Sequence, residues 1–516
     1  MKIRMRRTFK IGIIFLLIVT TGLFSCIKES PKDFTRPNIV YILADDMGPG
    51  DVSAINGNAA WKTLNIDRIA DEGKTFTDAH SGSAVCSPTR YGILTGRYAW
   101  RSSLKSGVLW SWDKELIEDG RITVASLLKE NGYKTACIGK WHLGLGWQYV
   151  KEYPDSVDFS RKILNGPTTR GFDYFYGITA SLDIPPYVYI EDDKVTALPD
   201  RFTQDTSKFG WWRLGATGSD FEHDQVLPHL TQKVVNFIQL QKSTKNDQPF
   251  FIYFALPAPH TPILPTRRFK GKSGTNPYGD FVLRVDHTVG QVYKALEEAG
   301  FSDNTVLIFT SDNGCSPQAD YEQLAEFGHN PSLVYRGHKA DIYEGGHRVP
   351  FVASWPGKIP AAAISNQTIC LTDLIATCAD IINVDLPENA GEDSYSLLPL
   401  LLEEPEMIIR ESTIHHSVNG SFAIRKGKWK LIMCPGSGGW SYPIPKVAQE
   451  LNLPLVQLYD LDSDVGETNN IAEKYPEVVN ELKNLLNADI LSGRSTPGEN
   501  QENVPSDNWP GVSWMK

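Results

Sequence analysis

The chain has 516 residues, of which 41% are hydrophobic and 22% are charged, and its formal net charge is −10 at pH 7. This is an ordinary globular composition, and the length allows about three domains or one dominant α/β core. No basic run follows the N-terminal residues, which argues against nucleic acid as a partner. Any anion-binding site must therefore be a local feature of an acidic protein.

The first 36 residues are typical of an export signal followed by a tether. Five basic side chains occupy the first ten positions, and the apolar run 11–24 that follows is too short to span a bilayer as a helix. The tetrapeptide that ends at Cys26 resembles a bacterial lipobox. We therefore expect a lipoprotein signal peptide over 1–25, a lipid anchor at Cys26 and a tether over 26–36. Phe24 is unusual in a lipobox, which leaves ordinary signal-peptidase cleavage open, but both routes predict a protein exported to the periplasm or the outer membrane.

The mature chain is expected to begin with a central strand of a parallel sheet. Residues 38–44 are apolar after the first, as in a strand that is buried on both faces. Two adjacent acids, Asp45 and Asp46, end this run, and a solvated turn is the ordinary alternative for such a pair. A helix over 64–72 and an extended segment over 75–79 are predicted next.

Residues 86–97 (Cys-Ser-Pro-Thr-Arg-Tyr-Gly-Ile-Leu-Thr-Gly-Arg) are predicted to form a loop that turns into a short helix. Pro88 suits the first helical turn, and Gly96 suits the position after the last one. Cys86 then lies at the helix N-terminus, where free N–H groups and the helix dipole favour an anion. Arg90 can share its face one turn later. The ordinary alternative is a buried cysteine, because cysteine mostly behaves as a small hydrophobe.

Three further predicted strands end in polar side chains. They are 133–139, followed by Lys140 and His142; 250–256, followed by His260; and 305–310, followed by Asp312 and Asn313. Where the extended conformation persists, Lys140 and His142 point to the same side of the strand. Because ligands of open α/β sheets bind at the carboxyl ends of the strands, we expect these side chains to meet Asp45 and Asp46 there. The other elements predicted in this part are helices over 123–131, 230–241 and 282–299 and a strand over 349–355, with Lys339 before the last.

The segment 146–225 is irregular and rich in aromatic residues and prolines, as expected of loops that shape a pocket rim. Four of its side chains could hold a sugar: Trp147, Asp183, Tyr187 and Trp211. The alternative is that its aromatic residues belong to the core.

The C-terminal quarter predicts a small antiparallel sheet and a helix. Short strands over 413–418, 421–425, 429–433 and 456–461 precede a helix over 476–491. We expect a catalytic domain over 37–400, a C-terminal subdomain over 401–492 and a loosely packed tail over 493–516. Apart from Cys26 and Cys86, five cysteines remain, and their odd number and spacing indicate buried thiols and no disulfide framework.

The string 86–97 resembles the signature of the type I, arylsulfatase A-like sulfatases at every fixed position, and further similarity runs from about residue 38 to 472. The resemblance implies an α/β fold of the alkaline-phosphatase kind: a large mixed, mostly parallel sheet flanked by helices, with a smaller C-terminal antiparallel sheet plus helix. It also implies that Cys86 becomes formylglycine through a formylglycine-generating or anaerobic sulfatase-maturating enzyme.

The resemblance further implies one bound Ca²⁺ ion and a set of site residues. The metal ligands would be Asp45, Asp46, Asp312, Asn313 and the modified residue 86, an oxygen-rich set that suits a hard cation. The catalytic side chains would be Cys86, Arg90, Lys140, His142, His260 and Lys339. In this family the hydrated formylglycine attacks sulfur, His260 and Lys339 assist the leaving oxygen, and His142 takes the proton that releases sulfate. Lys140 binds sulfate oxygens, and Arg90 helps to hold the nucleophile.

The expected function is hydrolysis of sulfate esters. The expected substrate is a sulfated carbohydrate, and exo action would release sulfate from a galactose- or hexosamine-type terminal residue. No nucleic-acid partner is expected, and a membrane is reached only through the lipid at Cys26. Two alternatives stay open at this point. One is a phosphoester or phosphonate hydrolase of the alkaline-phosphatase superfamily, and the other is a non-catalytic lipoprotein that binds sulfated glycans.

Overall fold

The computed structural model describes residues 36–151, 156–244, 248–402, 407–507 and 509–515, which belong to one compact unit. The expected signal peptide, the lipid anchor and all but the last residue of the tether lie outside the described residues, so they stay predictions. No helix within these described ranges combines the length and the apolar character that a membrane span requires.

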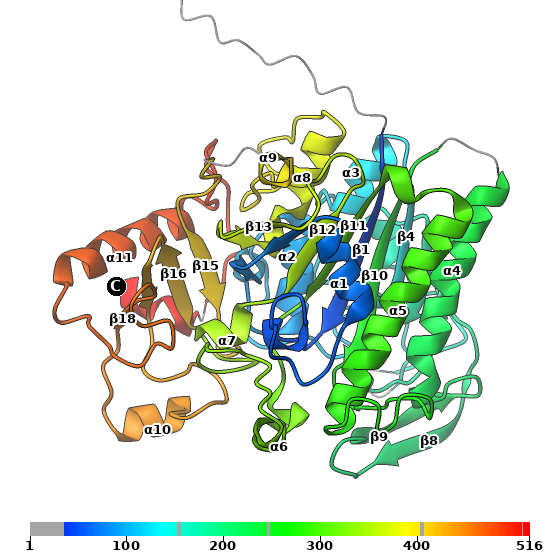
Figure 1. The fold of residues 1–516 in the computed structure, drawn as a ribbon, viewed down its shortest axis with the longest axis horizontal. Coiled ribbons are helices and arrows are strands. Elements are labelled where there is room, and N and C mark those ends of the chain that lie inside the picture. Colours follow the sequence, from blue (N-terminus) through cyan, green and yellow to red (C-terminus); the bar gives the residue numbers. More distant parts are fainter. Residues whose placement is uncertain (1–35, 152–155, 245–247, 403–406, 508, 516) are drawn as a thin grey trace, which may run out of the picture. The chain divides into compact units, whose positions relative to one another are not determined.

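A ten-stranded sheet forms the centre of the structure (Figure 1). Its strands are β1 Asn38–Asp45, β2 Lys74–Phe76, β4 Lys134–Lys140, β5 Tyr174–Ile178, β6 Ile190–Glu191, β7 Lys194–Val195, β10 Phe250–Pro259, β11 Thr305–Ser311, β12 Phe351–Ser354 and β13 Ala363–Ser365. The spatial order is β13-β2-β12-β11-β1-β10-β4-β5-β6-β7. The five strands from β11 to β5 are parallel, and β12 runs antiparallel to β11. The predicted large mixed, mostly parallel sheet is confirmed.

Helices cover both faces of this sheet. They are α1 Leu64–Asp71, α4 Val226–Thr244 and α5 Pro277–Ala299 on one face, and α2 Cys86–Thr95, α3 Val124–Glu130 and α8 Leu374–Ile381 on the other. Strand β1 shows the alternation that this requires: Val40 and Ile42 belong to the core shared with α1, α4 and α5, whereas Tyr41 lies beside Leu374 of α8. Both faces of the central strands are dry, which explains their continuous apolar sequence.

Two predictions for the middle of the chain need correction. Helices α4 and α5 begin earlier than expected, and Asn276 caps α5 through hydrogen bonds from the N–H groups of Tyr278 and Gly279. The segment predicted to be irregular contains β5, which extends the sheet, and a separate hairpin of β8 Pro199–Asp205 and β9 Trp212–Gly218. No residue of β8 is buried and only three residues of β9 are, so the sequence of the hairpin lacks a long apolar run.

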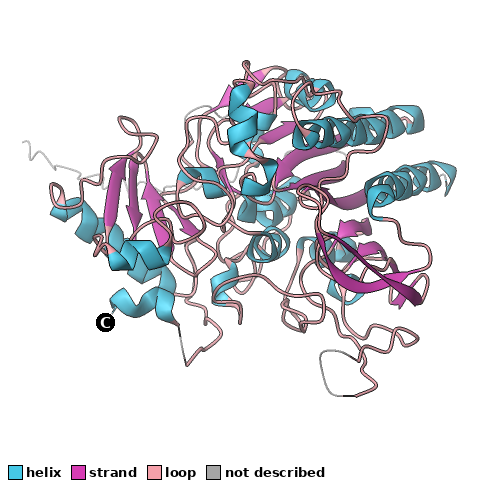
Figure 2. Ribbon diagram, turned by 90° about the horizontal axis from the view of Figure 1, so that it is seen from below, coloured by secondary structure: helices cyan, strands magenta, loops and turns pink. Residues whose placement is uncertain are grey.

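The C-terminal antiparallel sheet is also confirmed. It consists of β15 Thr413–His416, β16 Phe422–Lys426, β17 Trp429–Ile432 and β18 Gln457–Asp460, and α11 Pro476–Leu491 packs against it (Figure 2). The remaining elements are β3 Ala79–His80, β14 Ile369–Cys370, α6 Tyr321–Glu326, α7 Glu344–His347, α9 Leu398–Leu401 and α10 Pro445–Glu450. The domain boundaries at 37, 400 and 492 stay predictions.

Parts of the tail after residue 492, which is expected to be loosely packed, contact the C-terminal sheet. The tail's aromatic side chains Trp509 and Trp514 pack against the core of that sheet, and the ring of Trp509 lies 6.1 Å from that of Trp100. The carbonyl of Glu502 accepts a hydrogen bond of 2.5 Å from Arg97. Proline, glycine and asparagine in the tail therefore mark turns in an ordered segment.

A buried ionic cluster joins the C-terminal sheet to the segment of α7. The Lys430 Nζ on β17 lies 3.0 Å from Glu344 Oε1 and 2.8 Å from Glu467 Oε1, and all three side chains are buried completely. The Nζ also lies 3.1 Å from the Nε2 of His347. Because these groups are out of contact with water, each charge depends on its partners.

Replacing Lys430 by methionine is expected to lower the free energy of unfolding by about 3–5 kcal/mol, because two buried carboxylates lose a shared cation. Urea denaturation followed by tryptophan fluorescence measures this loss. Lys428→Met is the matched control: Lys428 is an exposed lysine next to the same strand, 2.7 Å from Asp460, and its loss should change stability by less than about 0.5 kcal/mol. Equal effects of the two substitutions would contradict a stabilising role for the cluster.

Candidate active site

The string 86–97 folds as predicted. Helix α2 begins at Cys86 and ends before Gly96, whose φ of +66° is left-handed. A Cβ at Gly96 would lie 2.3 Å from the Cγ2 of Ile375, so both conformation and space require glycine there. Cys86 is only 3% exposed. The sulfur thus lies at a helix N-terminus and is almost completely buried.

The carboxyl ends of β1 and β11 bring the predicted acidic residues together. Asp45 is the last residue of β1 and Asp46 follows it, Asp312 and Asn313 follow β11, and all four are buried. The N–H of Asp46 donates to the Oδ1 of Asp312 over 3.2 Å, and the Nδ2 of Asn313 donates to the Oδ1 of Asp46 over 2.7 Å. These contacts place the two pairs side by side, as the topology of parallel strands predicts.

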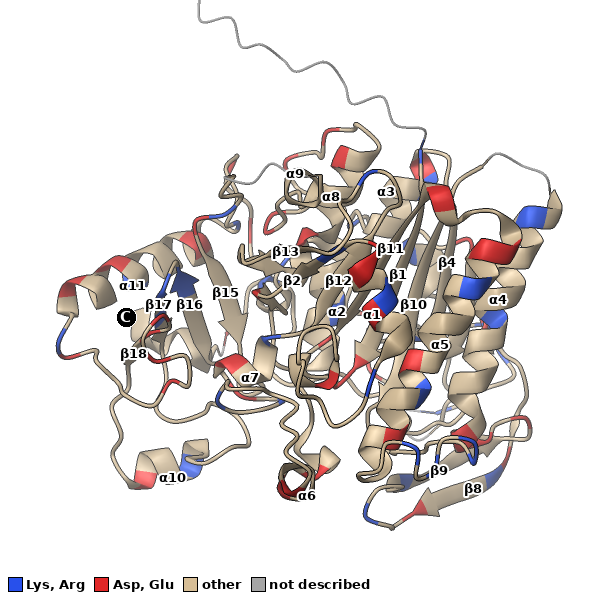
Figure 3. Ribbon diagram, viewed as in Figure 1, with Lys and Arg blue, Asp and Glu red and all other residues tan. Residues whose placement is uncertain are grey.

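Three buried cations neutralise these carboxylates. Arg90 donates to the Oδ2 of Asp312 through Nε at 3.0 Å and Nη2 at 2.7 Å. The Nζ of Lys140 lies 2.7 Å from Asp45, and the Nζ of Lys339 lies 2.7 Å from Asp46. On the outer helix α5, by contrast, basic and acidic residues are interspersed (Figure 3). The cluster of three cations is therefore a local feature of the site. This is what an anion-binding site in a protein of net negative charge requires.

The donor atoms of the site fit a hard cation. The Oδ1 atoms of Asp45 and Asn313 are buried and have no hydrogen-bond partner in the described part of the chain. Burial and the neighbouring Asp45 carboxylate raise the pKa of Asp312 to about 6. Asp45 shows the opposite direction: although burial opposes its charge, Lys140 and His260 hold its pKa below the usual value. Two buried oxygens without hydrogen bonds, one of them 3.5 Å from the Nη2 of Arg90, and crowded carboxylates are what a bound Ca²⁺ would satisfy.

His142 is held as a neutral base. Its φ is +58°, so the strand does not stay extended beyond Lys140, and the expected alternation does not place this ring. Instead, its Nε2 lies 2.8 Å from the carbonyl of Leu109, which fixes the proton on Nε2. The Nδ1 is buried without a partner among the described residues. Burial, together with Lys140 and Arg90, holds the pKa of His142 well below its ordinary value, so Nδ1 carries a free lone pair.

The unmodified Cys86 is a poor nucleophile in this place. Burial raises the pKa of its thiol, and the nearby Lys140 and Lys339 only offset part of this effect. Since the thiolate is the reactive form of cysteine, the free thiol is unreactive here despite its place at a helix N-terminus.

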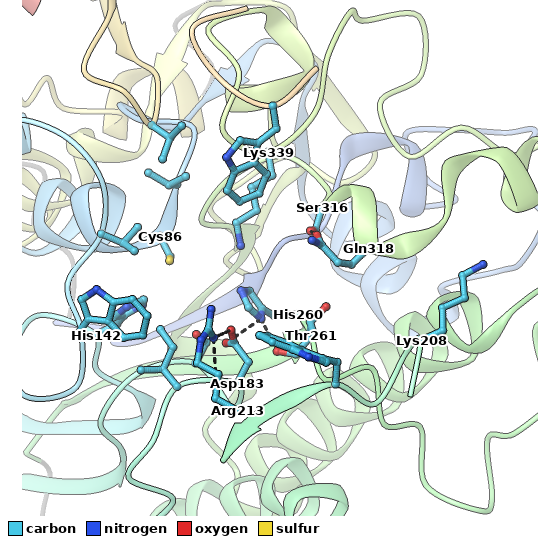
Figure 4. A pocket seen from close by; sticks show the side chains of 18 of the residues that line it. Cys86, His142, Asp183, Lys208, Arg213, His260, Thr261, Ser316, Gln318 and Lys339 are labelled. Carbon is cyan, nitrogen blue, oxygen red and sulfur yellow. Dashed lines mark hydrogen bonds and ion pairs between the residues drawn. The ribbon is translucent and has the colours of Figure 1, made fainter. Parts of the chain in front are cut away.

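A cavity of about 610 Å³ opens from Cys86 outward (Figure 4). His142, His260 and Lys339 line its inner end, so the predicted catalytic side chains that face open space meet in one cavity. His260 connects this end to the acids, because its Nε2 lies 3.5 Å from the Oδ2 of Asp46. A small substrate group at Cys86 would therefore meet cations and histidines on several sides.

The sugar-binding candidates divide into two groups. Asp183 and Trp211 line the cavity, but Trp147 and Tyr187 are buried in the core, which confirms the alternative for those two. Sequence reasoning did not find four other lining residues: Trp110, Arg213, Gln318 and Trp440. They come from separate loops and the β8–β9 hairpin, and no local pattern marks them.

The fold and this site define a hydrolase of the alkaline-phosphatase kind, and the comparisons give its family. Residues 37–384, more than half of the chain, match the protein family described as Sulfatase, and residues 338–491 match the family described as N-sulphoglucosamine sulphohydrolase, C-terminal. The chain belongs to the sulfatase family.

Curated relatives and solved structures agree. An N-acetylgalactosamine-6-O-sulfatase of Bacteroides thetaiotaomicron is 34% identical over 499 residues, which cover 89% of this chain and 94% of that protein. Human arylsulfatase A is 31% identical over 471 residues, 87% of each chain. A solved structure from work on glycosaminoglycan metabolism by B. thetaiotaomicron has a TM-score of 0.76 at 34% identity and covers 88% of this chain and 99% of that one. The enzyme is therefore a sulfuric ester hydrolase.

Proposed function

We propose that this sulfatase removes sulfate from a galactose- or hexosamine-type residue at the end of a glycan. The observation that carries the proposal is the cavity itself, which continues from Cys86 to Trp110, Trp211 and Trp440 at its mouth. Tryptophan faces are common contacts for sugar rings because they pair an apolar surface with little loss of side-chain entropy. A curated relative that is 34% identical is an N-acetylgalactosamine-6-O-sulfatase, which supports the same substrate class.

We propose the following roles for the residues of the site. Cys86 is oxidised to formylglycine, whose hydrate is the nucleophile, and Asp45, Asp46, Asp312 and Asn313 hold Ca²⁺. Bound calcium would supply positive charge next to the reacting oxygen atoms. Arg90 fixes Asp312 and lies beside residue 86 on the same helix face, which favours one orientation of the nucleophile.

The remaining residues move protons and bind the sulfate group. Lys140 and Lys339 place two buried ammonium groups beside the acids, where they can bind sulfate oxygens. His260 and Lys339 face the cavity and can protonate or stabilise the leaving oxygen. His142 accepts a proton at Nδ1, which is the unprotonated nitrogen in the observed tautomer.

A panel of sulfate esters tests the substrate class. We expect the purified enzyme to desulfate sulfated galactose or N-acetylgalactosamine with a kcat/KM at least about 100-fold above that for an aryl sulfate, because an aryl group leaves the polar wall of the cavity unpaired. Ion chromatography of released sulfate measures both rates. Equal or faster turnover of the aryl sulfate, with no sugar sulfate preferred, would refute the carbohydrate assignment.

We also propose, from the sequence alone, that the enzyme is an exported lipoprotein anchored through Cys26. A lipid tether would suit an enzyme that acts on external polymers. Separation of membrane and soluble fractions for the wild type and for Cys26→Ser tests this proposal, which fails if both proteins distribute alike.

A further inference from the structure

One carboxylate oxygen in the cavity wall makes no hydrogen bond within the described part of the chain. Asp183 is 9% exposed and lines the cavity, and its Oδ1 has no hydrogen bond to any described residue. Burial raises the pKa of Asp183, but His260, the hydroxyl of Ser181 and the guanidinium of Arg213 together hold it below the usual value, so the group is ionised. The Nδ1 of His260 lies 4.0 Å from the Oδ1 atom. A buried charged oxygen without a hydrogen bond, on a residue that lines a cavity, is costly unless a ligand donates to it.

Arg213 on β9 holds this carboxylate in place. Its Nη1 donates to the Oδ2 of Asp183 over 2.5 Å and to the carbonyl of the same residue over 3.0 Å (Figure 4). The guanidinium lies 5.2 Å from the ring centre of Trp110 and 4.7 Å from that of Trp211. Every side-chain hydrogen bond of Arg213 to a described residue uses Nη1. The N–H groups at Nε and Nη2 therefore remain available to donate to a ligand.

A buried tyrosine fixes the pair from behind. The hydroxyl of Tyr187 lies 2.6 Å from the carbonyl of Arg213 and 3.3 Å from the carbonyl of Asp183. The Tyr187 hydroxyl thus contacts the backbones of both Asp183 and Arg213. The indole rings of Trp110 and Trp211 restrict the movement of the guanidinium. The pair presents an acceptor and donors in a fixed arrangement before any ligand arrives, which lowers the entropy lost on binding.

The ring of His260 separates the Asp183–Arg213 pair from the acidic residues of the inner cavity. The Nδ1 of His260 is 4.0 Å from the Oδ1 of Asp183, and its Nε2 is 3.5 Å from Asp46 (Figure 4). Because so little space separates them, a group bound by Asp183 must belong to the same sugar residue that carries the sulfate ester.

Formal charges in this outer part of the cavity cancel. Asp183 pairs with Arg213, and the other lining cation, Lys208, pairs with Asp320. An uncharged sugar residue can bind there without leaving a charge unpaired, whereas the carboxylate of a uronate would face Asp183.

We propose that Asp183 and Arg213 determine substrate specificity by binding adjacent free hydroxyl groups of the sulfated residue, and that they select an uncharged hexose or N-acetylhexosamine over a uronate. This rests on the proposed carbohydrate sulfatase activity. A hydroxyl group both donates and accepts, so one hydroxyl can donate to Asp183 Oδ1 while its neighbour accepts from Arg213. Loss of such a hydroxyl leaves a buried charge unpaired, and sites of this kind discriminate strongly against deoxy analogues.

The test compares galactose 6-sulfate with its 2-, 3- and 4-deoxy analogues on the wild type and on Asp183→Asn. In the wild type, at least one deoxy analogue should lose about 100-fold or more in kcat/KM. In Asp183→Asn the penalty for that same analogue should shrink to less than about 10-fold, because the charged acceptor has gone. Arg213→Met, which keeps an apolar stem between the indoles, is expected to shrink the penalty at an adjacent hydroxyl.

Asp200→Asn is the matched control, because Asp200 also pairs with an arginine of the hairpin, at 3.2 Å from Arg201, but does not line the cavity. It should keep the wild-type pattern, and thermal melting should show that all variants are folded. Two results would overturn the inference: a wild type indifferent to every deoxy analogue, or an Asp183→Asn variant that loses the same factor on the parent sugar and on all analogues. A wild type that hydrolyses aryl sulfates but no sugar sulfate would instead refute the proposed function on which the inference rests.

Discussion

The Cys86→Ala substitution is expected to lower kcat/KM for every sulfate ester by about 10⁵-fold, which is the size of effect seen when a covalent nucleophile is removed. The physical reason is that no other group of the inner cavity can replace residue 86: His142 and His260 are bases beside it, and the lysines are held by carboxylates. Released sulfate is measured with the same preparation that is analysed by mass spectrometry.

Peptide mass spectrometry across residues 81–97 gives the companion result. The active wild type should carry an aldehyde or its hydrate in place of the thiol, in proportion to its specific activity. Cys378→Ala serves as the control, because it removes another buried thiol, on α8, and should stay within about 3-fold of the wild type. An active preparation with only unmodified cysteine at position 86 would disprove the formylglycine nucleophile.

The second large effect concerns the metal. Asp312→Asn should weaken calcium binding by at least about 100-fold and lower kcat/KM by about 10³-fold, because the amide keeps the shape of the side chain but lacks its charge. The asparagine oxygen can still accept from Arg90, so the buried guanidinium keeps a partner. Metal analysis of the dialysed protein and a calcium titration of activity measure the two losses, and excess calcium should restore part of the activity.

Asp286→Asn is a matched control for this substitution. Asp286 is also a buried carboxylate, and it accepts hydrogen bonds of 2.9 Å from the N–H groups of Asn65 and Ile66 at the start of α1, remote from the proposed metal ligands. It should leave the calcium content unchanged. The ligand assignment is wrong if Asp312→Asn purifies with a full complement of calcium and normal activity.

Much of the central sheet could be predicted because its strands have a simple environment. Strands β1, β10 and β11 are buried on both faces, so each appears in the sequence as one apolar run that ends in polar residues. Parallel pairing then determines that Asp45 and Asp312 meet at one edge, without any knowledge of side-chain contacts.

The outer cavity could not be predicted in the same way. Strand β9 packs in a two-stranded hairpin, and its sequence shows neither strict alternation nor an apolar run. Asp183 and Arg213 are 30 residues apart and meet only because the hairpin folds back over the loop that contains Asp183. The alternation of side chains along an extended strand predicted that His142 lies in the site, but this strand geometry does not hold at His142. Its left-handed backbone depends on contacts with Leu109 and Thr179 that no local pattern reveals.

The burial of α2 sets a time limit on the making of the active enzyme. All ten residues of α2 are buried, and the carbonyl of His416, 333 residues after Ser83, accepts a hydrogen bond from that serine just before the helix. At about 5–20 residues per second, a ribosome needs roughly 20–60 s to reach that strand, and until then the segment around Cys86 lacks its cover. If Cys86 is oxidised as proposed, the modifying enzyme has to act before the C-terminal sheet docks. The yield of active molecules would then follow from a race between oxidation and docking of the C-terminal sheet, and not from the stability of the finished protein.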